Sequence, residues 1–329
     1  MLSGTLFPYH PKPRPDELLS SWIVRTALGH GQRPHGFCSA VWPSTNVWTR
    51  DVDSLVPPVL LAGMARRTAT PLERAEQTTL ASLEGELFEF HFPNGRTKWI
   101  LRGGIYHRLR RNPWLQYCPH CLAEDEEPYY RRSWRLAFVA TCSKHSVVLN
   151  DRCPMCESPL MPYRAKEIHL CHACQFDLRN APAEPAYFPA LAIQRQCEAT
   201  LGFGWGKQGE FWFLRSILFF DLLHQVLRVI STGPRSGRLR EFIASRWGGN
   251  ATPPTFPAGS REFEALGSED RHRTLGLAFH VLDGWPWKFV GACAEAGVWH
   301  SWAMRDCRKA PYAYEEPISR FLRHSLPAS

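Results

Sequence analysis

The chain has 329 residues, of which 44% are hydrophobic and 21% charged, and its formal net charge is +8. This composition is typical of a folded protein and argues against intrinsic disorder, and the length accommodates two or three domains. The N-terminus has no basic start followed by an apolar stretch, so we expect no signal peptide and a soluble, cytoplasmic protein without a membrane partner.

An amphipathic helix is the first element that the sequence predicts. The stretch ELLSSWIVRTALGHG, which begins at Glu17, places apolar pairs four residues apart on one face, and glycines at Gly29 and Gly31 end it. Arg25 is expected to project from the opposite face. A plain core helix accounts for this pattern without any further role.

Two helices joined by a short turn follow. An apolar helix is predicted over residues 58–67, and Thr70-Pro71-Leu72-Glu73 is typical of a capping-box start with proline at the first helical position. This outline matches a helix-turn-helix, although any two short helices look alike. Its exposed face would offer DNA five side chains: Arg66, Arg67, Arg74, Gln77 and Thr78.

A basic patch comes next, in the stretch RGGIYHRLRR. Residues 1–112 contain 14 Lys and Arg against 9 Asp and Glu, so nucleic-acid contact is most plausible in this part of the chain. A solvated surface explains the same residues equally well. The arginines that would meet phosphates are Arg102, Arg108, Arg110 and Arg111.

Four pairs of metal-ligand residues, each with two residues between its members, are the strongest signal in the chain. Two such turns supply the four nitrogen or sulfur ligands of a structural zinc ion, so the sequence predicts two ions. Sequential pairing of the turns and a cross-braced pairing use the same residues, and spacing alone does not choose between them. The predicted ligands are Cys118, Cys121, Cys142, His145, Cys153, Cys156, Cys171 and Cys174.

The predicted zinc ions are structural and not catalytic. A catalytic zinc keeps an open position beside three protein ligands, whereas both predicted sets close at four. His120, His169 and His172 are nearby substitutes for a predicted ligand. Seven thiolates and two zinc ions together remove three charges from the formal +8, which leaves a mildly basic +5.

The remainder of the chain is predicted to be helical. Residues 211–230 are its most apolar segment, but they include charged side chains that a bilayer tolerates poorly, so we expect a buried helix. Residues 202–208, GFGWGKQ, lack the leading glycine and the final Ser or Thr of a phosphate-binding loop. The sequence therefore predicts a mainly α protein with an N-terminal helix-turn-helix-type domain (1–112), a central tandem zinc-ribbon or knuckle module (113–181) and a C-terminal helical domain (182–329).

The chain resembles the TniQ family of transposition targeting proteins. The resemblance rests on PKPRPDELLSSWIVRTA near the start, on TPLERAEQTTL, and on the stretch YCPHCLAEDEEPYYRRSWRLAFVATCSKHSVVLNDRCPMCESPL. It covers about residues 5–180, with a weaker likeness at LAFHVLDGWPWKFV. The resemblance implies the zinc-ligand roles of the eight residues, their sequential grouping and the helix-turn-helix. It gives no DNA-contact residues.

The resemblance also implies a function. Such proteins are non-enzymatic adaptors that mark target DNA and recruit an AAA+ ATPase transposition regulator. Some members read a DNA site themselves, others sit on an RNA-guided CRISPR effector complex, and some act as homodimers. A freestanding zinc-containing transcription regulator is the alternative, and an enzyme such as a nuclease is disfavoured because no carboxylate cluster accompanies the closed zinc sites.

Overall fold

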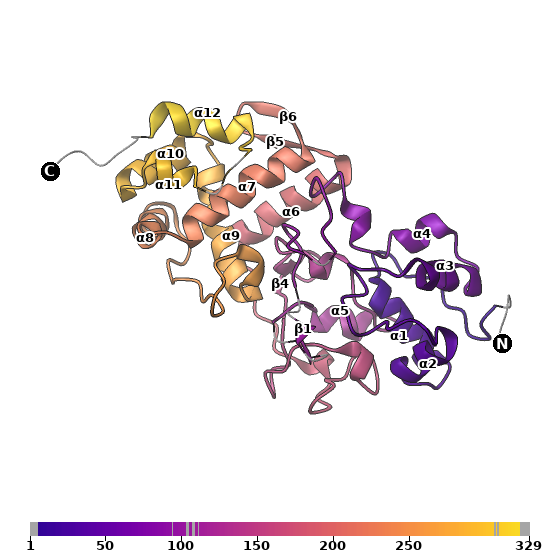
Figure 1. Ribbon diagram of the computed structural model, residues 1–329. Helices are drawn as coiled ribbons and strands as arrows, with labels where there is room; N and C mark the ends of the chain where they lie inside the picture. Colours follow the sequence, from indigo (N-terminus) through magenta and orange to yellow (C-terminus); the bar gives the residue numbers. More distant parts are fainter. Residues whose placement is uncertain are drawn as a thin grey trace. The chain divides into compact units, whose positions relative to one another are not determined.

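The computed structural model describes residues 6–93, 95–102, 105–106, 109–110, 112–305, 307 and 309–322. The described chain is mainly helical with a few short strands, as the sequence predicts (Figure 1). It divides into two compact units. Unit 1 comprises residues 1–84, 90–139 and 149–184, and unit 2 comprises residues 85–89, 140–148 and 185–329. The division into three domains at residues 112 and 181 stays a prediction, since compactness alone does not define a domain.

Unit 1 is built from short elements. Its longest described helix is α1, with eleven residues. The remaining secondary structure consists of helices of one to three turns and a hairpin whose two strands have two residues each. Short helices gain little stability by themselves, so this unit depends on tertiary contacts. Its elements are α1 (Leu19–Gly29), α2 (Pro34–Val41), α3 (Pro58–Arg67), α4 (Leu72–Glu76), η1 (Ala81–Leu83), β1 (Ile105–Tyr106), β2 (Leu109–Arg110), α5 (Pro119–Glu124), η2 (Ser133–Arg135), η3 (Pro162–Arg164) and η4 (Leu178–Asn180).

Helix α1 is buried almost all round, and this corrects the prediction for Arg25. Its guanidinium does not project into solvent: Arg25 is 3% exposed, and its Nη1 lies 2.6 Å from a carboxylate oxygen of the buried Glu17. A second ion pair joins Arg25 to Glu127. The prediction for Arg25 was wrong because helical periodicity identifies the polar side of a helix but does not show whether a buried carboxylate faces that side.

A second buried cation lies at Arg135 in η2. Its guanidinium donates to Asp51 and to Asp53, at 2.5 and 3.1 Å, and also to the carbonyl of Leu101. Asp53 receives two further hydrogen bonds from the backbone and hydroxyl of Ser20. Burial raises the pKa of Asp53 to about 6 despite the neighbouring guanidinium. Unit 1 thus contains charged groups that are stable only while they remain paired.

Helices α3 and α4 are joined by a tight turn, as predicted, but the start of α4 differs from the prediction. The helix begins after Pro71 without a side-chain cap, and the Thr70 hydroxyl instead bonds the Thr68 hydroxyl at 2.8 Å. Ala69 adopts a φ of 48° at the turn. The capping-box prediction is therefore wrong, because Thr68 takes the hydroxyl that the cap needs. With five residues, α4 is also shorter than α3.

Unit 2 has longer helices around an apolar core. Helices α6 and α7 have 16 residues each and both pack on α9 (Figure 1). The elements of this unit are β3 (Thr141–Cys142), β4 (Val147–Val148), α6 (Phe188–Phe203), β5 (Trp205–Gln208), β6 (Phe211–Arg215), α7 (Ser216–Ser231), α8 (Ser236–Trp247), η5 (Phe263–Ala265), α9 (Ser268–Leu282), α10 (Trp287–Ala296), α11 (His300–Ala303) and α12 (Tyr312–Phe321).

The apolar segment 211–230 is only partly the buried helix that was predicted. Its first five residues form β6, which pairs antiparallel with β5, and α7 begins at Ser216. From there Phe219, Phe220 and Leu223 are fully buried. Among the described residues no helix is both long and apolar enough to span a bilayer.

Candidate metal centres

Three of the four ligand pairs share one backbone shape. In each, the backbone N–H of the residue that follows the second ligand donates to the carbonyl of the first ligand. The donors are Ser146, Glu157 and Gln175, and the three hydrogen bonds measure 2.7, 2.9 and 3.0 Å. All three donor residues have left-handed φ values, of 53°, 56° and 63°. This tight turn brings both ligands of a pair to the same side, which suits a shared ion.

The first pair, Cys118 and Cys121, is placed differently. Cys118 is the N-cap of α5, Pro119 occupies the first helical position, and Cys121 follows within the first turn. The N–H of Leu122 donates to the Cys118 carbonyl at 3.1 Å, which is an ordinary helical bond. The start of α5 thus brings the two ligands of this pair to the same side, as the left-handed turn does in the other three pairs.

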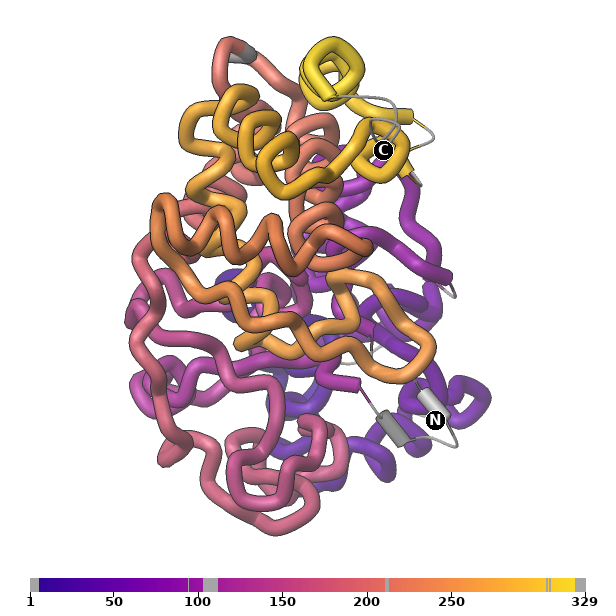
Figure 2. The backbone as a smooth tube through the Cα atoms, turned by 90° about the vertical axis from the view of Figure 1, so that its left-hand side faces the viewer, coloured from indigo at the N-terminus to yellow at the C-terminus, as the bar shows by residue number. Residues whose placement is uncertain are grey.

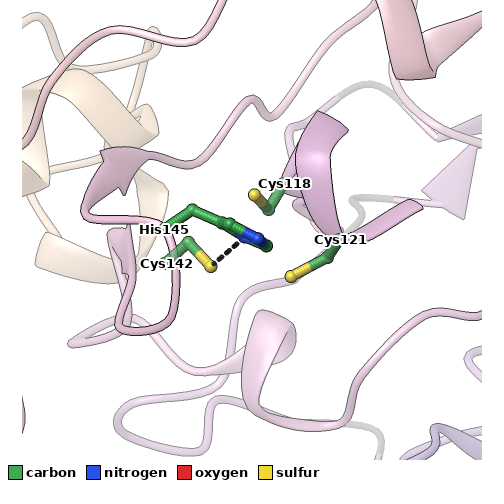
Figure 3. Close-up of side chains that lie close together, drawn as sticks. All are labelled: Cys118, Cys121, Cys142 and His145. Carbon is green, nitrogen blue, oxygen red and sulfur yellow. Dashed lines mark hydrogen bonds between the residues drawn. The ribbon is translucent and has the colours of Figure 1, made fainter. Parts of the chain in front are cut away.

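The first cluster consists of Cys118, Cys121, Cys142 and His145. One ligand atom from each lies within 4.8 Å of the others, and the three cysteines are buried. Figure 3 shows the side chains directed toward one another, with His145 Nδ1 3.4 Å from Cys142 Sγ. The second ligand pair comes from the turn between β3 and β4, whose register aligns Cys142 with Val147.

The second cluster consists of Cys153, Cys156, Cys171 and Cys174, again within 4.8 Å of one another. The Sγ atoms of Cys153 and Cys174 are 3.5 Å apart, and those of Cys156 and Cys171 are 3.7 Å apart. In contrast to the first cluster, two members, Cys156 and Cys174, are exposed. The chain therefore groups its ligands sequentially, which resolves the choice that spacing left open.

The separations fit a tetrahedral zinc ion. Zinc–sulfur bonds of about 2.3 Å and zinc–nitrogen bonds of about 2.0 Å place neighbouring ligand atoms roughly 3.5–3.8 Å apart, and a disulfide would bring the sulfurs to about 2.0 Å. Burial raises the pKa of Cys153 to about 12, so this thiol keeps its proton near neutral pH unless a cation stabilises the thiolate. Both clusters have the composition of a site that holds zinc.

The three histidines that stood as substitute ligands are not part of either cluster. His169 instead lies near a carboxylate oxygen of Glu167, with its Nε2 at 3.5 Å. Burial lowers the pKa of both His169 and His172. His120 follows Pro119 on α5 and is exposed.

The predicted DNA-facing residues of α3 and α4 do not all share one exposed face. Arg66 and Gln77 are exposed, whereas Arg67 is half-buried with its guanidinium 5.4 Å from the Phe7 ring centre. Arg74 is exposed but donates to the carbonyl of Pro13 at 2.8 Å, so it holds the N-terminal arm.

Thr78 does not lie on the exposed face that the sequence predicted. It is 3% exposed, and its hydroxyl donates to the Ala75 carbonyl at 2.6 Å. This is a correction: the helix ends at Glu76, and the chain turns inward at the position where a longer helix would have kept Thr78 outside.

The second predicted group of arginines is only partly visible. Arg102 is half-buried, and Arg110 lies in β2 without a described side chain. Arg108 and Arg111 lie outside the described residues. Their role as phosphate contacts stays a prediction.

Sequence reasoning missed one exposed group of side chains, in unit 2. Phe203, Trp205 and Phe213 are 80%, 53% and 86% exposed, and they come from the end of α6 and from the β5–β6 hairpin. The segment containing the first two had been considered only as a phosphate loop. The alternation of glycine and aromatic residues in GFGWG was the available signal, because glycine spacing there leaves the aromatic rings on one side.

Comparison with known proteins identifies the N-terminal part of the chain. Residues 8–149 match the model of the TniQ family, so this part of the chain is similar to a TniQ domain. The matched span contains all four ligands of the first cluster, whereas the second cluster follows it. No curated protein matches the chain. The TniQ family is one of transposition-associated adaptors, which are non-catalytic.

Proposed function

We propose that this protein is a target-selection adaptor of DNA transposition, which links a target on DNA to an AAA+ ATPase transposition regulator. The TniQ match over residues 8–149 carries the proposal. The target is either a DNA site that the protein reads itself or a recognition complex already bound to DNA, such as an RNA-guided CRISPR effector.

The two metal clusters support an adaptor more than an enzyme. Each brings four protein donors together, with no position left for a reacting water at a tetrahedral ion. We propose zinc as the ion in both. It would hold the ligand turns rigid and so fix the surfaces that flank them, since metal binding supplies much of the folding free energy of such modules.

The exposed arginine of α3 is the residue through which we expect unit 1 to approach DNA. Arg66 lies in the last turn of α3 and is exposed, so it can meet a phosphate without disturbing the core. Its neighbour Arg67 packs over Phe7, and Arg74 holds the N-terminal arm, so these two contribute less freely.

Selection of genomic DNA by the purified, zinc-loaded protein tests how the target is found. Enrichment of one site at roughly physiological salt means direct reading, and Arg66→Glu should then weaken binding while Arg246→Glu, at another exposed arginine, should not. A flat profile from folded protein means that a recognition complex supplies the address.

Capture of the ATPase regulator tests the adaptor role itself. The tagged, zinc-loaded protein should retain an AAA+ ATPase transposition regulator from the same source, and retention should fall when both ions are removed by a chelator. Site-specific DNA binding without any retained ATPase would instead favour a freestanding transcription regulator and would overturn the proposal.

A further inference from the structure

The outer face of the β5–β6 hairpin carries exposed aromatic rings beside cations. Trp205 and Phe213 are 53% and 86% exposed, and the side chains of Lys207 and Arg215 are exposed on the same strands. Trp205 and Arg215 are register partners across the hairpin. In Figure 2 the hairpin forms the loop at the top of unit 2. Phe203, 80% exposed, extends this face at its base.

The inner face of the hairpin is anchored, so the outer face is held in one orientation. A Cβ on Gly206 would lie 2.9 Å from the Thr200 side chain and 3.1 Å from the Phe219 ring, which shows that the strand packs directly on α6 and α7. Gln208 is 4% exposed and donates to the Leu282 carbonyl at 2.7 Å. The outward side chains therefore do not owe their exposure to a loose strand.

Charge and shape together favour one kind of occupant. Aromatic rings flanked by lysine and arginine on a small antiparallel ribbon are the combination that binds unpaired bases by stacking and the backbone by charge. The described outward-facing residues of the two strands include no carboxylate, and the guanidinium of Arg215 forms no hydrogen bond or ion pair with any described residue. Glu86 lies at the base of the hairpin, where its carboxylate accepts a hydrogen bond from the Ser216 hydroxyl at 3.2 Å, and Glu210 lies in the turn that joins the two strands.

Duplex DNA fits this face less well. Its bases are already stacked on one another, so exposed rings of a two-stranded ribbon gain no stacking partner from them, whereas a single strand offers free base faces. A purely protein partner would be expected to meet a more continuous apolar surface with fewer cations at its centre.

We propose that the outer face of the β5–β6 hairpin binds single-stranded nucleic acid, with bases stacked on Trp205 and Phe213 and phosphates beside Lys207 and Arg215. This goes beyond the adaptor role and does not depend on it. The face lies outside the matched span of the TniQ domain. The shared ligand chemistry is an unpaired, flexible strand, whether DNA or RNA.

Fluorescence anisotropy with three labelled probes tests the proposal on the full-length, zinc-loaded chain. The probes are a 20-nucleotide thymidine strand, a 20-nucleotide uridine RNA and a 20-base-pair duplex. At a roughly physiological salt concentration we expect at least one of the two single strands to bind more tightly than the duplex. The tighter of the two single strands identifies DNA or RNA as the ligand, and no binding of either overturns the proposal.

Substitutions on the face locate the binding. Trp205→Ala and Phe213→Ala should each weaken single-strand binding about tenfold, and Trp205→Phe should retain most of it, because stacking needs a ring and not an indole. Lys207→Gln and Arg215→Gln should each reduce the slope of log affinity against log salt by about 0.7. Phe188→Ala, at another exposed aromatic of unit 2, is the matched control and should change nothing.

Two results contradict the proposal directly. Unchanged single-strand affinity in the Trp205→Ala, Phe213→Ala double variant would exclude the face, and if that variant also failed to retain the ATPase, the face would be a protein-docking surface. An equal loss in Phe188→Ala would show that the effect is not local. Circular dichroism and the thermal midpoint verify that each variant is folded, which is expected because both rings are exposed. Retention of the ATPase by a variant that has lost single-strand binding separates this proposal from the adaptor role.

Discussion

The two compact units are stabilised by different kinds of interaction. Unit 1 combines short helices with buried ion pairs at Arg25 and Arg135 and with the four-cysteine cluster. Unit 2 places two 16-residue helices around a core in which Phe219 and Phe220 are fully buried. Apolar burial stabilises without any particular partner, whereas buried charges and thiolates are stable only with theirs. Conditions that remove partners should therefore affect unit 1 first.

Removal of the metal should give the largest difference in stability between the two units. We expect Cys153→Ser, or treatment with a chelator, to expose residues 150–181 to fast amide exchange, while α7 and α9 keep their protection, because the ion supplies most of the folding free energy of a cysteine module. Hydrogen exchange followed by mass spectrometry measures both regions in one sample. Cys307→Ser, at a cysteine outside both clusters, is the control. Equal loss of protection in α7 and α9 would contradict the comparison.

Loss of one partner in the Arg135 network should be the next largest effect. Arg135→Met leaves Asp53 buried beside Asp51, so the unfolding free energy should fall by about 3 kcal/mol. Adding Asp53→Asn should recover part of this loss, since the second change removes the uncompensated charge. Urea unfolding of the single and double variants measures the recovery. If the loss of unfolding free energy in the double variant equals the sum of the losses in the two single variants, Arg135 and Asp53 do not stabilise each other by pairing their charges.

Acid should destabilise unit 2 through His272. This imidazole accepts a hydrogen bond from the Tyr187 backbone N–H at 3.0 Å, and burial, followed by the charge of Arg273, lowers its pKa to about 4. Between pH 6.5 and 4 the unfolded chain therefore binds more protons than the folded chain, so stability falls as pH falls through this window.

The loss expected from His272 between pH 7 and 4.5 is about 2 kcal/mol. His272→Gln should flatten the dependence, because glutamine does not titrate. Unfolding free energies of both proteins across the window measure the difference, and parallel pH profiles would exclude His272 as the titrating group.

Relief of strain in a ligand turn should be the smallest effect. Gln175 has a φ of 63°, where a side chain is disfavoured, so Gln175→Gly should stabilise the zinc-loaded second cluster by about 1 kcal/mol. Ala192→Gly inside α6 is the opposite control and should cost about 1 kcal/mol. Resistance to chelator in the first case and the thermal midpoint in the second measure these changes. A destabilising Gln175→Gly would mean that the glutamine side chain contributes more than its backbone costs.

The two clusters of candidate metal ligands were predictable from sequence because the information for each pair is local. A pair separated by two residues already implies a turn that presents both ligands, and the residue after the pair, such as Glu157 or Gln175, then needs a left-handed φ. The choice between sequential and cross-braced pairing was not local. It depended on which turns the rest of the chain brings together.

The predictions that were wrong share another cause, because each depended on contacts with residues distant in the sequence. Arg25 was placed outside because periodicity does not reveal its two partners, the buried Glu17 and the partly exposed Glu127. Thr78 was placed outside because α4 stops at Glu76 sooner than its composition suggests. The strand at the start of the apolar segment 211–230 was missed because a short apolar run fits a strand or a helix equally well, and pairing with β5 decides it.

If both clusters hold zinc, as we propose, their unequal exposure has a consequence for how long each ion stays bound. Cys156 and Cys174 reach the solvent, whereas the three cysteines of the first cluster are buried. At the second cluster a competing thiol from solution can attach to the ion before a protein sulfur has left, so the ion exchanges by substitution without an unfolding step. At the first cluster that route is closed, and exchange has to wait for the chain to open. In a cell short of zinc the chain would accordingly give up one ion early and the other late, which makes the second cluster the one whose occupancy follows the supply.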